Sequence, residues 1–305
     1  MKKIECLAVL VLSSTATLSI FAAEPRCPGN IASVPIHLVN RYLFMVQVTI
    51  DHSGPYNFLL DTGTQTTTVD TSLAGELHLS LKGSPVIDGI GFQAKASSAC
   101  LDLVDVGAHA VPNQKALVYD LHNVQAAGLP IRGVLGEDFL EHFDMLLDNA
   151  HSMLCLDDSG AMRAGMKGSR TPLVSQEKAA GIDGLSRSLI IEARLSDQSA
   201  PVRLWLDSGT NASLLFKPSE TLAGKLDRTR LLDGTGGNAA QTSYLPLPAQ
   251  DMTVASLKLQ KVPFLTPATA QKNLQVTEFD GLLTTWLFRR VFVDHDDRFA
   301  VLEPW

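Results

Sequence analysis

The chain has 305 residues, of which 45% are apolar and 19% are charged, a composition typical of a folded globular protein rather than a disordered or fibrous one. The formal net charge is -7 and no run of Lys and Arg occurs, which argues against a nucleic-acid partner. The length exceeds that of one typical domain and suffices for a full hydrophobic core.

The N-terminal residues are typical of a secretory signal peptide. Two lysines precede an apolar run over residues 7–12, and Ala22 and Ala23 provide a small-residue cleavage site. We therefore expect residues 1–23 to direct export to the periplasm or the extracellular space and to be removed. An uncleaved signal anchor is the alternative, but the apolar run is short for a membrane span. No stable membrane insertion is expected after cleavage.

A strand pair is predicted ahead of the first notable motif. Residues 44–50 alternate and are rich in Val and Ile, residues 51–55 have the composition of a turn, and residues 58–60 lead into Asp61. The motif, residues 58–64, reads FLLDTGT. The residues that follow its aspartate are Thr62, Gly63 and Thr64.

The same pattern returns 146 residues later, as LWLDSGT over residues 204–210. Asp207 takes the place of Asp61, and a strand–turn–strand pattern over residues 189–206 leads into it. The residues that follow this second aspartate are Ser208, Gly209 and Thr210. A repeat of this length indicates an internal duplication.

Each copy also ends in the same way. A Gly-apolar-apolar element occurs as GVLG at residues 133–136 and as GLLT at residues 281–284, and each is followed by a short helical turn and a closing strand. The two elements differ where Thr284 stands in place of Gly136. Many short strands bounded by Gly and Pro turns predict an all-β fold.

The two copies divide the chain. Residues 158–187 are rich in Gly, Ser and charge, so we interpret them as a linker. The predicted organisation is a signal peptide over residues 1–23, an N-terminal lobe over residues 24–157, and a C-terminal lobe over residues 188–305.

Two aspartates brought close together have a specific chemistry. Carboxylates within about 3 Å of each other do not both ionise readily, so the pair shares one proton. The ionised member can act as a general base on a bridging water, while the protonated member hydrogen-bonds a carbonyl and later donates its proton. Apolar residues before each aspartate bury the pair, and the two glycines allow close backbone approach.

The tripeptide Asp-Ser/Thr-Gly alone is weak evidence, because Asp158-Ser159-Gly160 also fits it. That third copy lacks the preceding apolar pair, the trailing Thr and the downstream Gly-apolar-apolar element, so we interpret it as a surface turn. The alternative for the other two copies is that both loops are plain β-turns of a duplicated barrel. Their matched surroundings favour a functional pair instead.

The two loops and the two Gly-apolar-apolar elements resemble those of the retropepsin-like aspartic peptidases. The resemblance covers residues from about 34 to 305 and implies two closed β-barrel lobes with a pseudo-twofold, pepsin-like arrangement. It implies that Asp61 and Asp207 are the catalytic aspartates. Their loops are supported by Thr62, Gly63, Thr64, Ser208, Gly209 and Thr210.

The resemblance also implies two hairpin flaps over the site, at matched distances from the aspartates. The first would contain Gly89, Ile90 and Gly91, and the second Gly234, Gly236 and Gly237. The alternative for each is an ordinary hairpin turn.

The expected function is that of an aspartic endopeptidase acting on peptides or proteins, with no metal and no cofactor. The eight histidines form no metal-ligand pattern, and no Gly-x-Ser-x-Gly motif occurs. One chain supplies both aspartates, so a monomer should suffice. The rival interpretations are a noncatalytic peptide-binding or scaffolding protein that retains the fold, and a peptidase that works only as a homodimer.

Three cysteines remain after the signal peptide: Cys27, Cys100 and Cys155. An oxidising compartment would allow one disulfide among them. The sequence does not select among the three possible pairings.

Overall fold

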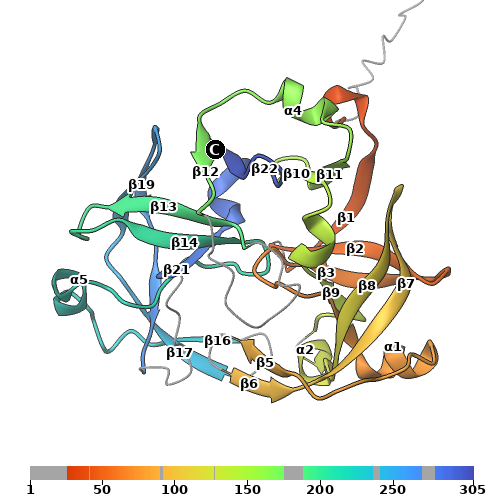
Figure 1. Cartoon of the computed structure of the whole chain (residues 1–305). Coiled ribbons are helices and arrows are strands. Elements are labelled where there is room, and N and C mark those ends of the chain that lie inside the picture. Colours follow the sequence, from red (N-terminus) through yellow and green to blue (C-terminus); the bar gives the residue numbers. More distant parts are fainter. Residues whose placement is uncertain are drawn as a thin grey trace, which may run out of the picture.

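The computed structural model describes residues 26–40, 42–89, 92–126, 128–174, 188–235, 241–269 and 279–305. These residues form two β-rich lobes joined by one sheet, as Figure 1 shows. The predicted all-β fold is confirmed, because the described helices are single short turns. The predicted signal peptide lies outside the described residues. No helix among those that are described is long and apolar enough to cross a membrane.

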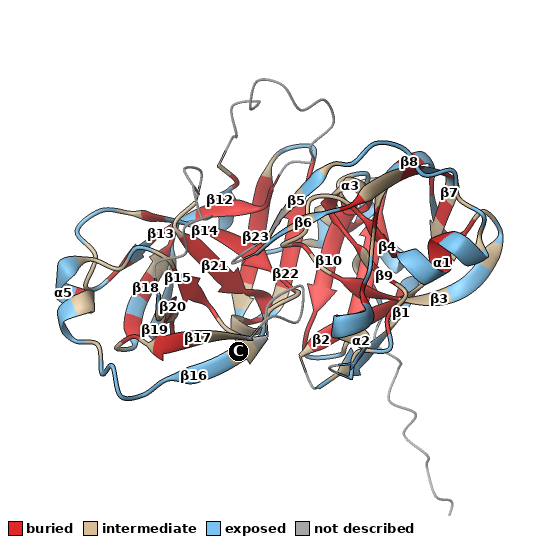
Figure 2. Ribbon diagram, turned by 90° about the horizontal axis from the view of Figure 1, so that it is seen from below, coloured by how far each residue is buried: buried red, intermediate tan, exposed pale blue. Residues whose placement is uncertain are grey.

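The sheet between the lobes is antiparallel and draws strands from both halves. Its centre is the pairing of β10 with β22, in which Leu147 lies opposite Val291. Figure 2 shows that β10 and β22 are buried. The strands in spatial order are β12 (Arg170–Pro172), β23 (Phe299–Pro304), β22 (Phe288–Asp294), β10 (Asp144–Asp148), β11 (Met153–Asp157) and β1 (Ser33–Val39).

The first lobe is a closed barrel. Its strands follow the order β2-β3-β9-β4-β8-β7, and β7 pairs back onto β2 to close it. The elements are β2 (Leu43–Ile50), β3 (Ser53–Leu60), β4 (Thr68–Asp70), β7 (Ser97–Val106), β8 (His109–Tyr119) and β9 (Gly133–Leu135), with helices η1 (Pro28–Asn30), α1 (Thr71–Glu76), α2 (His122–Ala126) and α3 (Glu137–Leu140).

The second lobe repeats the plan, but the counterparts of the long strands β7 and β8 are each divided in two, and β17 and β18 stand where β7 does. Where the first lobe has the long strand β8, the second has two strands, β19 and β20, separated by Pro263 and Phe264. Proline has no N–H to donate, so it breaks a strand ladder. The elements are β13 (Ile190–Leu195), β14 (Val202–Asp207), β15 (Leu214–Leu215), β16 (Leu232–Thr235), β17 (Gln241–Pro246), β18 (Gln250–Val254), β19 (Leu257–Val262), β20 (Leu265–Pro267) and β21 (Gly281–Thr284), with α5 (Glu220–Gly224) and η2 (Thr285–Leu287).

The strands that carry the two aspartates have matching neighbours. β3 pairs in parallel with β9, and β9 pairs antiparallel with β4. In the second lobe β14 pairs in parallel with β21, and β21 pairs antiparallel with β15. The apolar side chains before each aspartate are fully buried, as in Leu60 and Leu206. This matching is consistent with the internal duplication inferred from the sequence.

Part of the predicted linker is ordered. Residues 161–165 form α4 (Ala161–Gly165), and β12 pairs with β23 at the edge of the sheet between the lobes. The rest of it, residues 175–187, lies outside the described residues. A disulfide joins Cys27 to Cys155 and leaves Cys100 as an exposed free thiol. The sequence alone did not distinguish this pairing from the other two.

Candidate active site

The structure brings Asp61 and Asp207 together at the boundary of the lobes. Asp61 directly follows β3, and Asp207 is the last residue of β14. The two carboxyl groups lie close enough that the charge of Asp61 raises the pKa of Asp207. The loops cross closely, because a Cβ placed on Gly63 would lie 2.6 Å from Cγ of Asp207, and one on Gly209 would lie 2.5 Å from Cγ of Asp61. Only glycine fits at these two positions.

The residues after the aspartates bind the opposite loop. The Thr62 hydroxyl donates to the Leu206 carbonyl at 2.9 Å and accepts the Ser208 N–H at 3.0 Å. The Ser208 hydroxyl donates to the Leu60 carbonyl at 2.9 Å and accepts the Thr62 N–H at 3.1 Å. Both side chains are fully buried. The two loops therefore hold each other in register.

The two carboxyl groups have different partners within their own loops. Asp61 accepts the Gly63 N–H at 2.8 Å and the Thr64 hydroxyl at 2.7 Å. Asp207 accepts the Gly209 N–H at 2.7 Å. The Thr210 hydroxyl instead donates to the Ala212 carbonyl at 3.1 Å. Thr64 thus supports its aspartate through its side chain, as expected from the sequence, whereas the hydroxyl of Thr210 is directed elsewhere.

These differences distinguish the two pKa values. Burial raises the pKa of Asp207 well above its ordinary value, and the neighbouring charge of Asp61 raises it further. Burial also raises the pKa of Asp61, but the hydrogen bonds from Thr64 and Gly63 oppose this rise. The pair therefore shares one proton, and the hydrogen bonds from Gly63 and Thr64 favour the ionised form of Asp61.

The Gly-apolar-apolar elements pack behind the loops. In the first lobe the Glu137 N–H donates to the Thr64 carbonyl at 2.9 Å. In the second lobe the hydroxyl of Thr284 donates to the Thr210 carbonyl at 2.7 Å. Thr284, which stands where the first copy has Gly136, therefore donates a hydrogen bond to the carbonyl that is equivalent to that of Thr64.

A family model described as Aspartyl protease matches residues 46–139, which include the Asp61 loop and the first Gly-apolar-apolar element. The match is confined to the first lobe, and it makes that part of the chain similar to aspartyl proteases. No curated protein matches it. Among solved structures, the chain is similar to a retropepsin-like aspartic protease from Rickettsia conorii, at 22% identity and a TM-score of 0.33. That match covers 41% of this chain and 90% of the other.

Two residues that support these loops and their surroundings were not predicted from the sequence. The indole Nε1 of Trp205 donates to the Thr62 carbonyl at 2.8 Å. The half-buried carboxylate of Asp138 accepts both the N–H and the hydroxyl of Thr67, at 2.8 and 2.7 Å. The available signal for Trp205 was the difference between LWLD and FLLD in the two motifs.

Both segments predicted as flaps fall on hairpins. Gly89 ends β5 (Val86–Gly89), which pairs with β6 (Phe92–Lys95), and Gly234 lies in β16, which pairs with β17. Both hairpins lie at the bottom of Figure 1 and extend toward the middle of the molecule from opposite lobes. Ile90, Gly91, Gly236 and Gly237 lie outside the described residues, and contact with a substrate stays a prediction.

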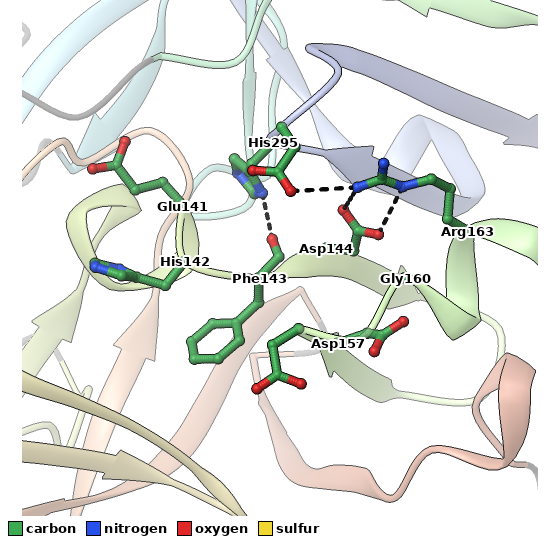
Figure 3. A pocket seen from close by; sticks show the side chains of 10 residues that line it. Glu141, His142, Phe143, Asp144, Asp157, Gly160, Arg163 and His295 are labelled. Atoms are coloured by element: carbon green, nitrogen blue, oxygen red, sulfur yellow. Dashed lines mark hydrogen bonds and ion pairs between the residues drawn. The ribbon is translucent and has the colours of Figure 1, made fainter.

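Two polar cavities lie apart from the aspartate pair. One of about 50 Å³ and one of about 190 Å³ share Glu141, His142, His295 and Asp296 in their linings, and neither lining includes Asp61 or Asp207. Figure 3 shows Arg163 bonded to Asp144 at the smaller cavity. In the described part of the chain no three His, Cys, Asp or Glu side chains gather to hold a metal ion.

Proposed function

We propose that this retropepsin-like chain is an aspartic endopeptidase whose catalytic residues are Asp61 and Asp207. The observation that carries the proposal is the close approach of the two aspartate loops, in which Gly63 lies against the Asp207 carboxyl group and Gly209 lies against the Asp61 carboxyl group. A pair of this kind provides one general base and one general acid in the same place. The family match to the segment around Asp61 supports hydrolysis of peptide bonds.

The proposed reaction begins with a water held between the two carboxyl groups. Asp61 removes a proton from this water as its oxygen bonds to the carbonyl carbon of the peptide, and Asp207 transfers its proton to the carbonyl oxygen. In the second step the C–N bond breaks. The proton on Asp61 goes to the leaving nitrogen, and a hydroxyl of the intermediate returns a proton to Asp207. Neither step forms a covalent bond between substrate and enzyme.

The setting of the reaction is also part of the proposal. The substrate is an extended peptide or protein segment bound beneath the β5–β6 and β16–β17 hairpins. The protein works after export, directed by residues 1–23, and the Cys27–Cys155 disulfide supports an oxidising compartment. A monomer suffices because one chain supplies both aspartates.

The test is peptide cleavage by the wild type, Asp61→Asn and Asp207→Asn across a diverse peptide library, from about pH 3 to about pH 8. Each variant is expected to lose at least about 10³-fold in kcat/KM. Asp158→Asn is the matched control, because this exposed aspartate has the same local motif but lies away from the pair. Rates proportional to enzyme concentration down to high dilution would support the monomer. A folded wild type that cleaves nothing would favour the noncatalytic binding protein.

A further inference from the structure

The indole of Trp205 reaches from β14 to the loop that carries Asp61. Its Nε1–H donates to the Thr62 carbonyl at 2.8 Å, across 143 residues of sequence. The side chain is buried, and Phe279 packs against the ring edge-to-face at a centroid distance of 5.1 Å. A buried indole with a satisfied N–H is held firmly in one orientation, so this bond is a fixed part of the loop.

The bond is made to the peptide unit that serves Asp61. The Thr62 carbonyl and the Gly63 N–H belong to one planar amide, and this N–H donates to Oδ1 of Asp61 at 2.8 Å. Accepting a hydrogen bond at its oxygen polarises an amide and strengthens the donation from its N–H. Trp205 therefore acts on Asp61 through one intervening peptide group.

The loop that carries Asp207 receives no equivalent hydrogen bond from the described part of the first lobe. Leu59 stands two residues before Asp61, as Trp205 stands two residues before Asp207, and its side chain has no donor for the Ser208 carbonyl. The Gly209 N–H bonds Asp207 without such support, and the Thr210 hydroxyl is directed to Ala212. The Thr64 hydroxyl and the Trp205 indole thus favour negative charge on Asp61, whereas the backbone N–H of Thr210 is the additional group that favours negative charge on Asp207.

We propose that Trp205 is a positioning residue that keeps the shared proton on Asp207 by strengthening the Gly63 N–H bond to the Asp61 carboxylate. The inference rests on the proposed function, in which Asp61 is the base. The charged group that faces Asp61 is Asp207, from the end of β14, and its other partners come from its own loop, through Gly63 and Thr64.

The sharpest test replaces Trp205 with 3-benzothienylalanine, which keeps the ring shape and exchanges the N–H for sulfur. The Asp61 carboxylate then loses support, so protonation of Asp61 occurs at higher pH. The acid limb of kcat/KM should move upward by about 0.3 to 1 pH unit. The value of kcat should fall by about 3- to 30-fold at the optimum, with KM little changed. Trp205→Phe is a second, genetically encoded variant and should move the limb in the same direction.

Phe279→Leu is the control, because it removes the ring that packs on Trp205 but keeps the indole N–H. It should lower stability without moving the acid limb. The proposal is overturned if the folded benzothienyl variant has the wild-type acid limb, or if Phe279→Leu moves the limb equally.

A readout independent of cleavage separates this inference from the proposed function. NMR of the side-chain carboxyl carbons (Cγ) of labelled aspartates follows the protonation of Asp61 and Asp207 directly. In the wild type Asp61 should titrate at lower pH than Asp207, and the benzothienyl variant should narrow that gap. If the wild type has no peptidase activity, the proposed function is wrong. The titration of the two aspartates still tests the role of Trp205 in that case. An unchanged gap would overturn that role.

Discussion

The hydroxyls of Thr62 and Ser208 each bond the backbone on both sides of the opposite lobe's aspartate, Asp207 for Thr62 and Asp61 for Ser208. The Thr62 hydroxyl bonds the Leu206 carbonyl and the Ser208 N–H, and the Ser208 hydroxyl bonds the Leu60 carbonyl and the Thr62 N–H. All of these groups are buried. Removing one hydroxyl therefore leaves a donor and an acceptor of the opposite lobe without partners.

Thr62→Val and Ser208→Ala are each expected to lower the free energy of unfolding by about 2 to 4 kcal/mol, because two buried polar groups lose their partners. The double variant should cost clearly less than the sum, since the two hydroxyls serve one network. Urea denaturation of the four proteins measures this coupling. Strictly additive costs would mean that the two hydroxyls act independently.

Gly136 and Thr284 occupy equivalent positions but should respond differently to substitution. A Cβ on Gly136 would lie 2.8 Å from the Thr64 carbonyl oxygen. We expect Gly136→Ala to displace the Asp61 loop, to cost about 1 to 3 kcal/mol, and to reduce peptidase activity strongly. Thr284→Gly removes the hydroxyl bond to the Thr210 carbonyl and should cost about 1 kcal/mol with less effect on activity. Thermal unfolding and kcat/KM of both variants check this order, and a reversed order would contradict it.

The sequence predicted the parts of the site that are local and repeated. The Asp-Thr-Gly and Asp-Ser-Gly loops, their preceding strands and the Gly-apolar-apolar elements each have a signal within a few residues, and the matching copies reinforce it. The contacts that break the symmetry had no such signal. The bond from Trp205 joins residues 143 positions apart, and the rotation of Thr210 toward Ala212 depends on a side-chain torsion that no pattern encodes.

Other features depended on the assembled sheet. The strand β12 is only three residues long, and it forms because the edge of β23 offers it partners. The disulfide required knowing that Cys27 lies beside β11, with the two Cα atoms 5.8 Å apart. Neither fact can be read from composition or spacing, because each depends on where distant segments meet.

The raised pKa of Asp207 predicts how stability changes with pH. A carboxyl group whose folded pKa is raised stabilises the fold below its unfolded pKa, and that contribution is lost as pH rises through the folded pKa. The Asp207→Asn variant has no ionisable group at this position, so its stability does not fall in this way as pH rises. The variant should therefore be more stable than the wild type near neutral pH, and the difference should shrink toward about pH 3. Melting temperatures across this range test the sign, with Asp158→Asn expected to follow the wild type.

The buried pair of Glu137 and His295 joins α3 of the first lobe to the turn after β22. His295 Nε2 lies 3.1 Å from Oε2 of Glu137, and Nδ1 lies 2.6 Å from the Phe143 carbonyl. Burial alone would lower the pKa of His295, but the hydrogen bond and charge of Glu137 outweigh it and raise this pKa. The stabilisation is thus present below the unfolded pKa of His295 and is lost as pH rises through the folded value.

Glu137→Gln and His295→Gln should each cost about 3 kcal/mol near neutral pH, because either change leaves a buried partner uncompensated. From about pH 7 to about pH 10 the wild type should lose stability more steeply than His295→Gln. His142→Gln, at an exposed neighbouring histidine, is the control and should keep the wild-type slope. Equal slopes for the wild type and His295→Gln would contradict a charged pair.

The disulfide between Cys27 and Cys155 turns the first lobe into a covalent ring that spans 128 positions of sequence and contains both Asp61 and the β5–β6 hairpin. A single backbone cut in that hairpin by any peptidase opens the ring without detaching either piece. Such a nicked molecule should migrate as one band in a denaturing gel without reductant and as two bands with it. Damage to this hairpin would thus pass unnoticed in a size assay that omits reductant.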